Sequence, residues 1–283
     1  MIVSNTKGAV SGIAGNNKLK RLEIRNWKGL TLGSAYLEQL KSAIPNLTDL
    51  ERLDLESMKI GNIDFSRLKH LRFLEVSGNE MTQLDVSSNV QLEYLNCNCN
   101  NLSELNLSGL SSLREIYCDG NPLTSLDVSG NGNLEVLGFS GTQICNIDVS
   151  NNSKITLIGC ENIPGLNCLD LSKNVNLQKL FINGDGFTSI DISNNTKLEE
   201  FGCRGNKIST LNVSNNRLLK ELSCVQQNRP DGKNYLQTLY IAGGQSIPHI
   251  TVDRSIDYIP AETIITTAPQ SGGGEGTGDE DWN

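Results

Sequence analysis

A hydrophobic residue returns every 21 positions through most of this chain. Only one step, from Ile155 to Leu177, is a residue longer. A single unit of this length cannot bury its own apolar side chains, so neighbouring units must stack and bury them together. The period therefore predicts one elongated solenoid. The recurring anchors are Leu50, Leu71, Leu92, Leu113, Leu134, Ile155, Leu177, Leu198 and Leu219.

Two short stretches of alternating apolar and polar residues fill each unit. Turns of Gly, Asn and Ser separate the two stretches and leave no room for a helix. The pattern predicts two short parallel strands per coil, and thus a mainly β solenoid with one sheet on each side of the stack. In the unit that begins at Leu113, the apolar side chains are Leu113, Ile116, Cys118, Leu123, Leu126 and Val128.

The two ends of the chain depart from this rhythm. Leu37, Leu40 and Ile44 have helical spacing, with Ser34 available as a cap and Pro45 as a stop. We expect this helix to close the N-terminal end of the stack, since terminal repeats are atypical. The predicted organisation is a flexible lead at 1–18, an N-terminal coil and capping helix at 19–49, regular repeats at 50–224, an inserted loop, last coil and cap at 225–265, and a disordered Gly-rich acidic tail at 266–283.

The order of residues within each unit resembles the leucine-rich repeat. The family core, L-x-x-L-x-L-x-x-N-x-L, appears as Leu92, Leu95, Cys97, Asn100 and Leu102. Over residues 19–252 the chain is similar to the short-coil bacterial branch of the family, which is related to internalins, and to cell-envelope repeat proteins of Gram-negative gut anaerobes. The resemblance implies leucine-rich-repeat coils and a binding module at the cell surface or secreted. It implies no particular ligand.

Two polar columns run through the repeats. The first resembles the asparagine ladder of the family, whose side chains satisfy backbone groups inside the turn; it contains Asn79, Asn100, Asn121 and Asn206. The second column consists mainly of aspartates. A calcium ladder is one alternative for it, because hard cations favour carboxylate oxygens. Nearby serines offer local hydrogen bonds, so we favour a turn-stabilising role and predict no metal site. This Asp column contains Asp85, Asp127, Asp148, Asp170 and Asp191, with Asn106 and Asn212 in the same register.

The cysteines follow the repeat rather than a disulfide pattern. Five of them share a register in which other coils carry Val76, Phe139 and Ile182, so they behave as small core hydrophobes. We predict that these five are buried and reduced: Cys97, Cys118, Cys160, Cys203 and Cys224. The other three, Cys99, Cys145 and Cys168, fall outside the core register and are predicted to be free thiols.

Composition excludes several function classes. A net charge of -8 argues against binding nucleic acid or an anionic membrane by bulk charge. The two histidines, His70 and His249, lie in different regions, so we expect neither a zinc site nor a catalytic triad, and no cofactor.

No stretch approaches the ~20 apolar residues of a membrane helix. The first residues also lack the apolar run of a signal peptide. This leaves a cytoplasmic protein or an exported one whose leader lies outside this sequence, and the resemblance favours the second.

The exposed positions of the first stretch vary more than a structural repeat requires. Phe, Tyr and Leu side chains on a rigid sheet are typical of interface anchors, and polar neighbours are typical of an interface rim. We predict a non-catalytic binding face on a monomer, for a protein partner or, as a weaker alternative, a glycan. A structural spacer domain is the competing interpretation. The predicted face contains Phe73, Tyr94, Asn96, Tyr117, Asp119, Leu157, Phe181, Arg204 and Tyr240.

Overall fold

The computed structural model describes residues 2–3, 13, 16–24, 33–224, 236, 238–250 and 264–267. Most of the predicted flexible lead, the predicted inserted loop at 225–235 and the tail beyond 267 lie outside these residues.

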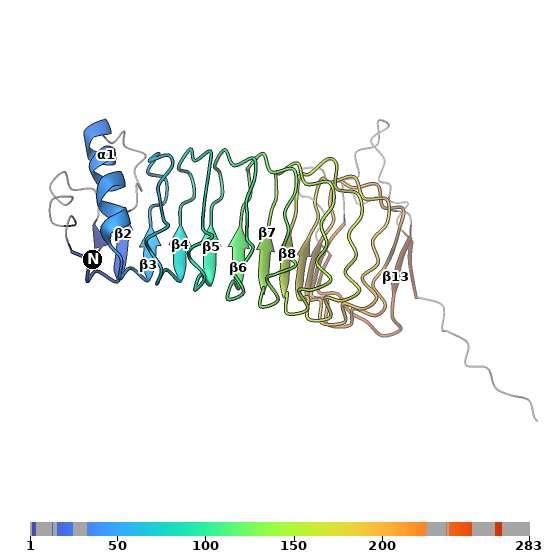
Figure 1. The fold of residues 1–283 in the computed structure, drawn as a ribbon. Coiled ribbons are helices and arrows are strands. Elements are labelled where there is room, and N and C mark those ends of the chain that lie inside the picture. The colour runs from blue at the N-terminus through green and yellow to red at the C-terminus, as the bar shows by residue number, and fades with distance from the viewer. Residues whose placement is uncertain are drawn as a thin grey trace, which may run out of the picture.

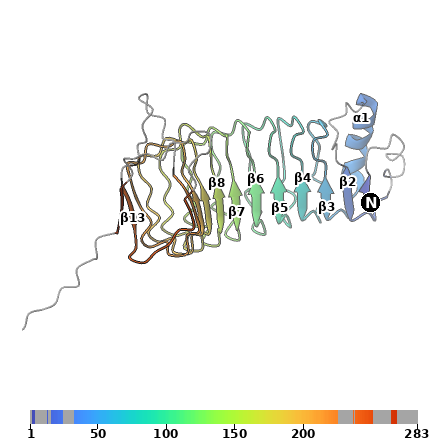
Figure 2. The ribbon, with the colours of Figure 1, turned by 180° about the vertical axis from the view of Figure 1, so that it is seen from behind.

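Twelve short strands form one parallel sheet along the stack, which we call the main sheet. Figures 1 and 2 show the strands of its N-terminal half side by side from both sides of the molecule. In order, the strands are β1 (Ile2–Val3), β2 (Arg21–Ile24), β3 (Arg52–Asp54), β4 (Phe73–Glu75), β5 (Tyr94–Asn96), β6 (Glu115–Tyr117), β7 (Val136–Gly138), β8 (Leu157–Gly159), β9 (Lys179–Phe181), β10 (Glu200–Gly202), β12 (Glu221–Ser223) and β14 (His249–Ile250).

The register of the main sheet follows the sequence period. Strands β4 and β5 pair residue Phe73 with Tyr94 and Leu74 with Leu95, a step of 21 residues. Between β8 and β9 the step is one residue longer, because Leu157 pairs with Lys179. Each regular coil therefore sets its strand directly beside the previous one, and the solenoid predicted from the period is confirmed.

The core is a continuous column of buried side chains inside the coils. The middle residue of each regular strand, such as Leu74 or Leu137, is fully buried. The five cysteines in the core register are also buried, as predicted, at 0 to 4 % exposure. Cys99, Cys145 and Cys168 are exposed, and all eight cysteines are free thiols. Burial raises the pKa of the core thiols, so they remain protonated and apolar in character.

The prediction of a second strand in every coil is wrong for the regular coils that precede Leu198. In the described residues, a second parallel sheet contains only β11 (Thr210–Asn212), β13 (Thr238–Ile241) and β15 (Ile264–Thr267). Side-chain hydrogen bonds run along this side whether or not a strand forms, since Asn212 of β11 accepts the N–H of Ser214 just as the aspartates of the other coils accept a serine N–H. Asp127 Oδ1 accepts the N–H of Ser129 at 2.9 Å, and Asn131 Nδ2 donates to the carbonyls of Leu107 and Leu110.

The predicted capping helix is present at the N-terminal end. Helix α1 (Ser34–Ala43) runs into a short 3₁₀ helix, η2 (Ile44–Asn46), which contains Pro45. Leu40 and Ile44 are fully buried, and Figure 1 shows α1 beside β2 at the end of the stack. Ser34 is not the cap, because the helix begins at Ser34 itself and Gly33 occupies the N-cap position without a side-chain hydrogen bond.

The asparagine ladder is confirmed. Asn100 is buried; its Oδ1 accepts the N–H groups of Asn79 and Met81, and its Nδ2 donates to the carbonyls of Val76 and Cys97. The turn-stabilising role of the Asp column is also confirmed, because each carboxylate accepts the N–H of the serine two residues later. These bonds hold the pKa of Asp148 and Asp170 below the ordinary value.

A second asparagine column, which the sequence reasoning did not separate, stabilises the other turn of each coil. Asn152 Nδ2 donates to the carbonyls of Val128 and Asn131, and Asn195 repeats this pattern two coils later. Both side chains are fully buried. Polar side chains thus satisfy the backbone at both turns of the coil, where strand pairing ends.

Candidate functional site

The exposed side of the main sheet, which we call the main-sheet face, carries the candidate site. Its side chains come from the first and third residues of each strand and from the second residue after it, since alternate residues point to opposite sides of a strand. All the predicted face residues except Tyr240 lie here: Phe73, Tyr94, Asn96, Tyr117, Asp119, Leu157, Phe181 and Arg204.

Tyr240 does not belong to the main-sheet face, so its placement in the predicted row is wrong. It lies in β13 of the second sheet, where it pairs with Asn212 of β11. The main sheet is instead continued by β14, in which Ile250 pairs with Leu222. Residues 225–235 do not follow the repeat. Counting by 21 therefore cannot tell which side of the coil the next apolar stretch occupies.

Four side chains at the N-terminal half of the face form a continuous stack. The rings of Phe73 and Tyr94 are parallel, with centroids 4.1 Å apart and an interplanar angle of 4°. Tyr117 follows at 5.8 Å and is tilted by 48°. On the other side, the Arg52 guanidinium carbon lies 3.3 Å from the centroid of the Phe73 ring, a cation–π arrangement. We call these four residues the aromatic stack.

Carboxylates hold the aromatic stack in place. Arg52 Nε donates to Glu23 at 2.8 Å, and the Tyr117 hydroxyl donates to Glu115 at 3.1 Å. Partial burial raises the pKa of Tyr94 to about 12, and burial together with Glu115 raises the pKa of Tyr117 as well. Both hydroxyls therefore remain hydrogen-bond donors at neutral pH.

Glycines in the next coil make room for two of the exposed rings. A Cβ atom at Gly138 would lie 3.2 Å from Cδ1 of Tyr117, and one at Gly202 would lie 3.1 Å from Cδ1 of Phe181. Both distances are tighter than ordinary van der Waals contact. Each ring thus leans over a glycine of the neighbouring strand, which keeps the ring close to the sheet.

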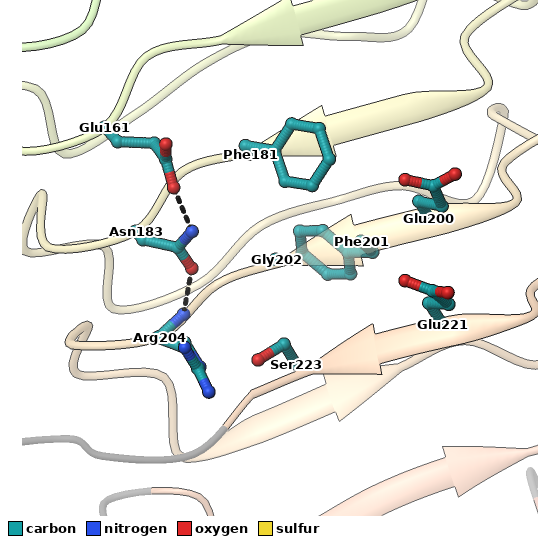
Figure 3. A pocket seen from close by; sticks show the side chains of 9 residues that line it. All are labelled: Glu161, Phe181, Asn183, Glu200, Phe201, Gly202, Arg204, Glu221 and Ser223. Atoms are coloured by element: carbon teal, nitrogen blue, oxygen red, sulfur yellow. Dashed lines mark hydrogen bonds between the residues drawn. The ribbon is translucent and has the colours of Figure 1, made fainter. Parts of the chain in front are cut away.

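Phe181 forms one wall of a hollow at the C-terminal half of the face, with a volume of about 380 Å³. Gly202 is on its floor. Asn183 Nδ2 donates to Glu161, and Asn183 Oδ1 accepts the backbone N–H of Arg204 at 2.6 Å (Figure 3). We call this cavity the Gly202 hollow. It is lined by Glu161, Phe181, Asn183, Glu200, Phe201, Gly202, Arg204, Glu221 and Ser223.

Five of the eight predicted residues on this face fall into two groups, and Asn96, Asp119 and Leu157 belong to neither group. Phe73, Tyr94 and Tyr117 meet in the aromatic stack, and Phe181 and Arg204 meet in the Gly202 hollow. Leu157, in the first position of β8, pairs with Val136 and Lys179 and is outside both groups.

Sequence reasoning missed Arg52 in the stack and the glycine floors. Arg52 was detectable, because it precedes Phe73 by 21 residues in the same register. No sequence pattern indicates that a ring leans over a glycine of the next strand. Chemically, the face offers aromatic contact area, carboxylates and guanidinium groups. Across the described residues, no three His, Cys, Asp or Glu side chains gather into a candidate metal site.

Solved structures share this fold. The functional domain of InlJ from Listeria monocytogenes, which includes a cysteine ladder, superposes with a TM-score of 0.66 and 28 % identity, covering 84 % of this chain and 47 % of that one. The chain has the leucine-rich-repeat fold and is similar in structure to the internalins. It spans about half the length of the InlJ chain. The core-register cysteines of this leucine-rich-repeat protein, such as Cys97 and Cys118, stack on neighbouring coils.

Two further structures show the same fold at lower identity. Internalin InlF from Listeria monocytogenes matches with a TM-score of 0.61 and 19 % identity over 95 % of this chain and 85 % of its own. A leucine-rich-repeat protein of Leptospira interrogans matches with a TM-score of 0.57 and 19 % identity over 74 % and 67 %. No protein-family model matches the sequence, and no curated protein matches it. In the described part of this leucine-rich-repeat protein, no helix is long and apolar enough to cross a membrane.

Proposed function

We propose that this leucine-rich-repeat protein is a non-catalytic recognition module that binds a protein partner through its main-sheet face. The observation that carries the proposal is the gathering of Phe73, Tyr94, Tyr117 and Phe181 on this one face, outside the core. Aromatic side chains fixed on a rigid surface lose little rotamer freedom on binding, which favours their use as anchors.

Two features of the face support a protein partner over a spacer role. First, the residues on it change from coil to coil, from a phenylalanine at Phe73 to a glutamate at Glu115 and a lysine at Lys179, although the buried residues between them stay apolar. Second, aromatic centres are flanked by hydrogen-bonding side chains such as Asn96 and Asp119, the arrangement found at interface rims. A spacer has no need of the first feature, whereas Asn96 and Asp119 also accept the backbone N–H groups of Asn98 and Ser140 within the coils.

We propose further that the protein acts at the cell envelope or after secretion. The relation to internalins supports this location, and fractionation of the native organism with an antibody to the chain tests it. Recovery of the chain in the cytoplasmic fraction alone would contradict it.

Affinity capture tests the binding function. Purified chain is immobilised and exposed to surface-protein extracts, and captured proteins are quantified for the wild type and for a Tyr117→Ala, Phe181→Ala double variant. The variant should fold normally, because neither side chain is in the core. Loss of two anchors should reduce capture of the specific partner by about tenfold or more.

A matched control removes apolar area away from the main-sheet face. Val175 and Leu218 are 46 % and 53 % exposed, so a Val175→Ala, Leu218→Ala variant loses comparable exposed apolar side chains. Its capture should equal that of the wild type. Equal capture by the wild type and by the Tyr117→Ala, Phe181→Ala variant would reject the proposed face and favour the spacer interpretation.

A further inference from the structure

Strands β7, β8 and β10 of the main sheet all end in glycine, and only one of these glycines has open space above it. Gly138 and Gly202 are buried, because an exposed ring leans over each of them. Gly159, the last residue of β8, is only half-buried. The nearest atom to its Cβ position is Ser140 Oγ at 3.9 Å, an ordinary contact. The chain therefore has room for a side chain at Gly159 that it does not use.

Neither backbone conformation nor internal packing requires glycine at position 159. Its φ is not in the left-handed region, and an added Cβ would meet no close contact. Glycine inside a strand lowers stability relative to alanine. Glycine in a strand also marks sites that a ligand or another backbone approaches closely. This combination indicates that the group that fills the space comes from outside the chain.

Apolar side chains surround the open position. Val136 and Leu157, the first residues of β7 and β8, are half-buried. The Tyr117 ring leans over β7, and Phe181 of β9 pairs with Gly159 from the other side. Strands β7 and β9 are two strand spacings apart, about 10 Å, which is enough for one large side chain between the rings. We call this space the Gly159 gap.

A column of charged residues that precedes the main-sheet strands is interrupted beside the Gly159 gap. Arg114 and Glu135 form an ion pair between neighbouring coils at 2.9 Å. The next two residues in this register, Thr156 and Gln178, are uncharged. Charged residues resume in the following coils, at Glu199 and Lys220. A partner can therefore displace water from the centre of the face without burying a charge of this column.

The rim around the Gly159 gap is acidic. From β6 to β9, the exposed strand positions and the second residues after the strands, all of them described, hold the acids Glu115, Asp119 and Glu161. The one base at these positions, Lys179, already forms an ion pair with Glu200 at 2.7 Å. A basic partner surface is therefore complementary in charge. A second copy of this chain, with its net charge of -8, is not.

We infer that the Gly159 gap receives one bulky apolar side chain of the protein partner, carried on a basic surface of that partner. The apolar side chain lies on Gly159 between the Tyr117 and Phe181 rings and covers Val136 and Leu157. The basic residues beside it face the acidic rim. Binding energy at protein interfaces concentrates in such dry apolar centres surrounded by polar contacts. This inference rests on the proposed function, since it specifies the chemistry of the partner.

A valine at position 159 tests the gap by filling it from within the chain. Gly159→Val should fold with a melting temperature equal to or above that of the wild type, because its Cβ has room and β-branched residues favour strands. Gly159→Ala fills less of the space and is the second variant if valine lowers the melting temperature. Gly130→Val is the matched control, since Gly130 is an exposed turn residue with no atom within 4 Å of its Cβ position.

Synthetic peptides provide a partner surface of defined chemistry. The test pool has the form Lys–Lys–Ser–X–Ser–Lys–Lys with blocked termini, where X is an equal mixture of Leu, Met, Phe and Trp. One comparison peptide has Ser at X, and one comparison pool has Glu in place of every Lys. The test pool should bind the immobilised full chain about tenfold more tightly than either comparison. Gly159→Val should remove its advantage over the Ser peptide, and Gly130→Val should keep that advantage.

Three results would overturn the inference. The first is the absence of a preference for the test pool, including no binding at all. The second is a preference over the Ser peptide that persists in Gly159→Val and Gly159→Ala. The third is a wild-type dimer in analytical ultracentrifugation that Gly159→Val dissociates, which would make a second copy of the chain the occupant.

The affinity capture experiment separates failure of this inference from failure of the proposed function. If the peptide result is negative and the Tyr117→Ala, Phe181→Ala variant still loses its captured partner, the face binds protein but the Gly159 gap is not where the apolar side chain lies. If that capture is also unchanged, the proposed function fails as well.

Discussion

The two long sides of the solenoid are built from the same repeat, yet they differ in how much their exposed residues vary. On the side of the Asp column, an aspartate or asparagine accepts the N–H of a serine two residues later in coil after coil. On the main-sheet face, the equivalent positions hold Arg52, Phe73, Tyr94, Glu115 and Val136 in succession.

Shape alone does not separate the two sides. The Asp-column side also has a hollow, of about 710 Å³, but its lining includes repeated residue types such as Asp85, Asn106 and Asp127, which already bond within their own turns. The residues that line the Gly202 hollow mostly change from strand to strand, although Glu200 and Glu221 share a register. Repeated polar residues therefore maintain the coil, and the changing aromatic residues of the main-sheet face are available for recognition.

The largest predicted effect on stability lies in the asparagine ladder. In Asn100→Ala, the buried N–H groups of Asn79 and Met81 and two carbonyls lose their partners. The free energy of unfolding should fall by about 2 to 5 kcal/mol, measured by urea denaturation. A loss below about 1 kcal/mol would show that the ladder is not what maintains the turn.

A buried aspartate in the same ladder should make stability depend on pH. Asp185 replaces the asparagine; its Oδ1 accepts the N–H of Ile163 at 2.6 Å, and its buried Oδ2 has no partner among the described residues. Burial raises the pKa of Asp185 to about 7. The folded protein therefore keeps a proton that the unfolded chain loses near its ordinary pKa, so the contribution of Asp185 to stability falls as pH rises from about 4 to about 7.

Asp185→Asn should remove this pH dependence. In the equivalent position, Asn206 Nδ2 donates to the carbonyls of Ile182 and Cys203, and a new asparagine can do the same in its own coil. The variant should be more stable than the wild type by about 1 to 3 kcal/mol at pH 8, and the difference should shrink as pH falls toward 4. Identical melting curves for the two proteins between pH 4 and pH 8 would contradict a raised pKa.

A smaller effect is expected where a ring leans over a glycine on the main-sheet face. Gly138→Ala places a methyl group 3.2 Å from Tyr117 Cδ1 and should cost about 1 kcal/mol. Gly130→Ala is the control, because no atom lies within 4 Å of its Cβ position. If the contact is the cause, Gly138→Ala should cost nothing further in a Tyr117→Ala background. The same cost in both backgrounds would exclude the ring contact.

The smallest effect is predicted for the Asp column. If its carboxylates only stabilise turns, millimolar calcium should leave the melting temperature nearly unchanged, because a ligand stabilises only when its concentration exceeds the dissociation constant. A rise of several degrees with calcium, absent in an Asp148→Asn, Asp170→Asn variant, would establish a metal role and weaken the contrast between the two sides.

Most of the fold was predictable because its determinants repeat locally. The period of 21 locates the core, and the exchange of Cys97 with Val76 identifies it as a core position. The extent of the second sheet was not predictable, since the same alternation of apolar residues and the same side-chain cap occur at Asp127, where no strand forms, and at Asn212, which is in β11.

The candidate site was only partly predictable, for a different reason. Membership of the face follows from the register, so Phe73, Tyr94, Tyr117 and Phe181 were placed correctly. The grouping of these residues into the aromatic stack and the Gly202 hollow depends on their side-chain rotamers, and the strand register does not determine rotamers. Tyr240 was misplaced because residues 225–235 do not follow the repeat, so the 21-residue period does not predict which sheet Tyr240 joins.

The proposed function requires that the variable residues of the main-sheet face contact the partner. Hydroxyl-radical footprinting of the chain, alone and in complex with its captured partner, measures this directly. We expect protection of the Tyr94, Tyr117 and Phe181 rings, and unchanged oxidation of Cys145 and Cys168, which are exposed outside the face. Protection of the two cysteines with unchanged oxidation of the three rings would contradict it.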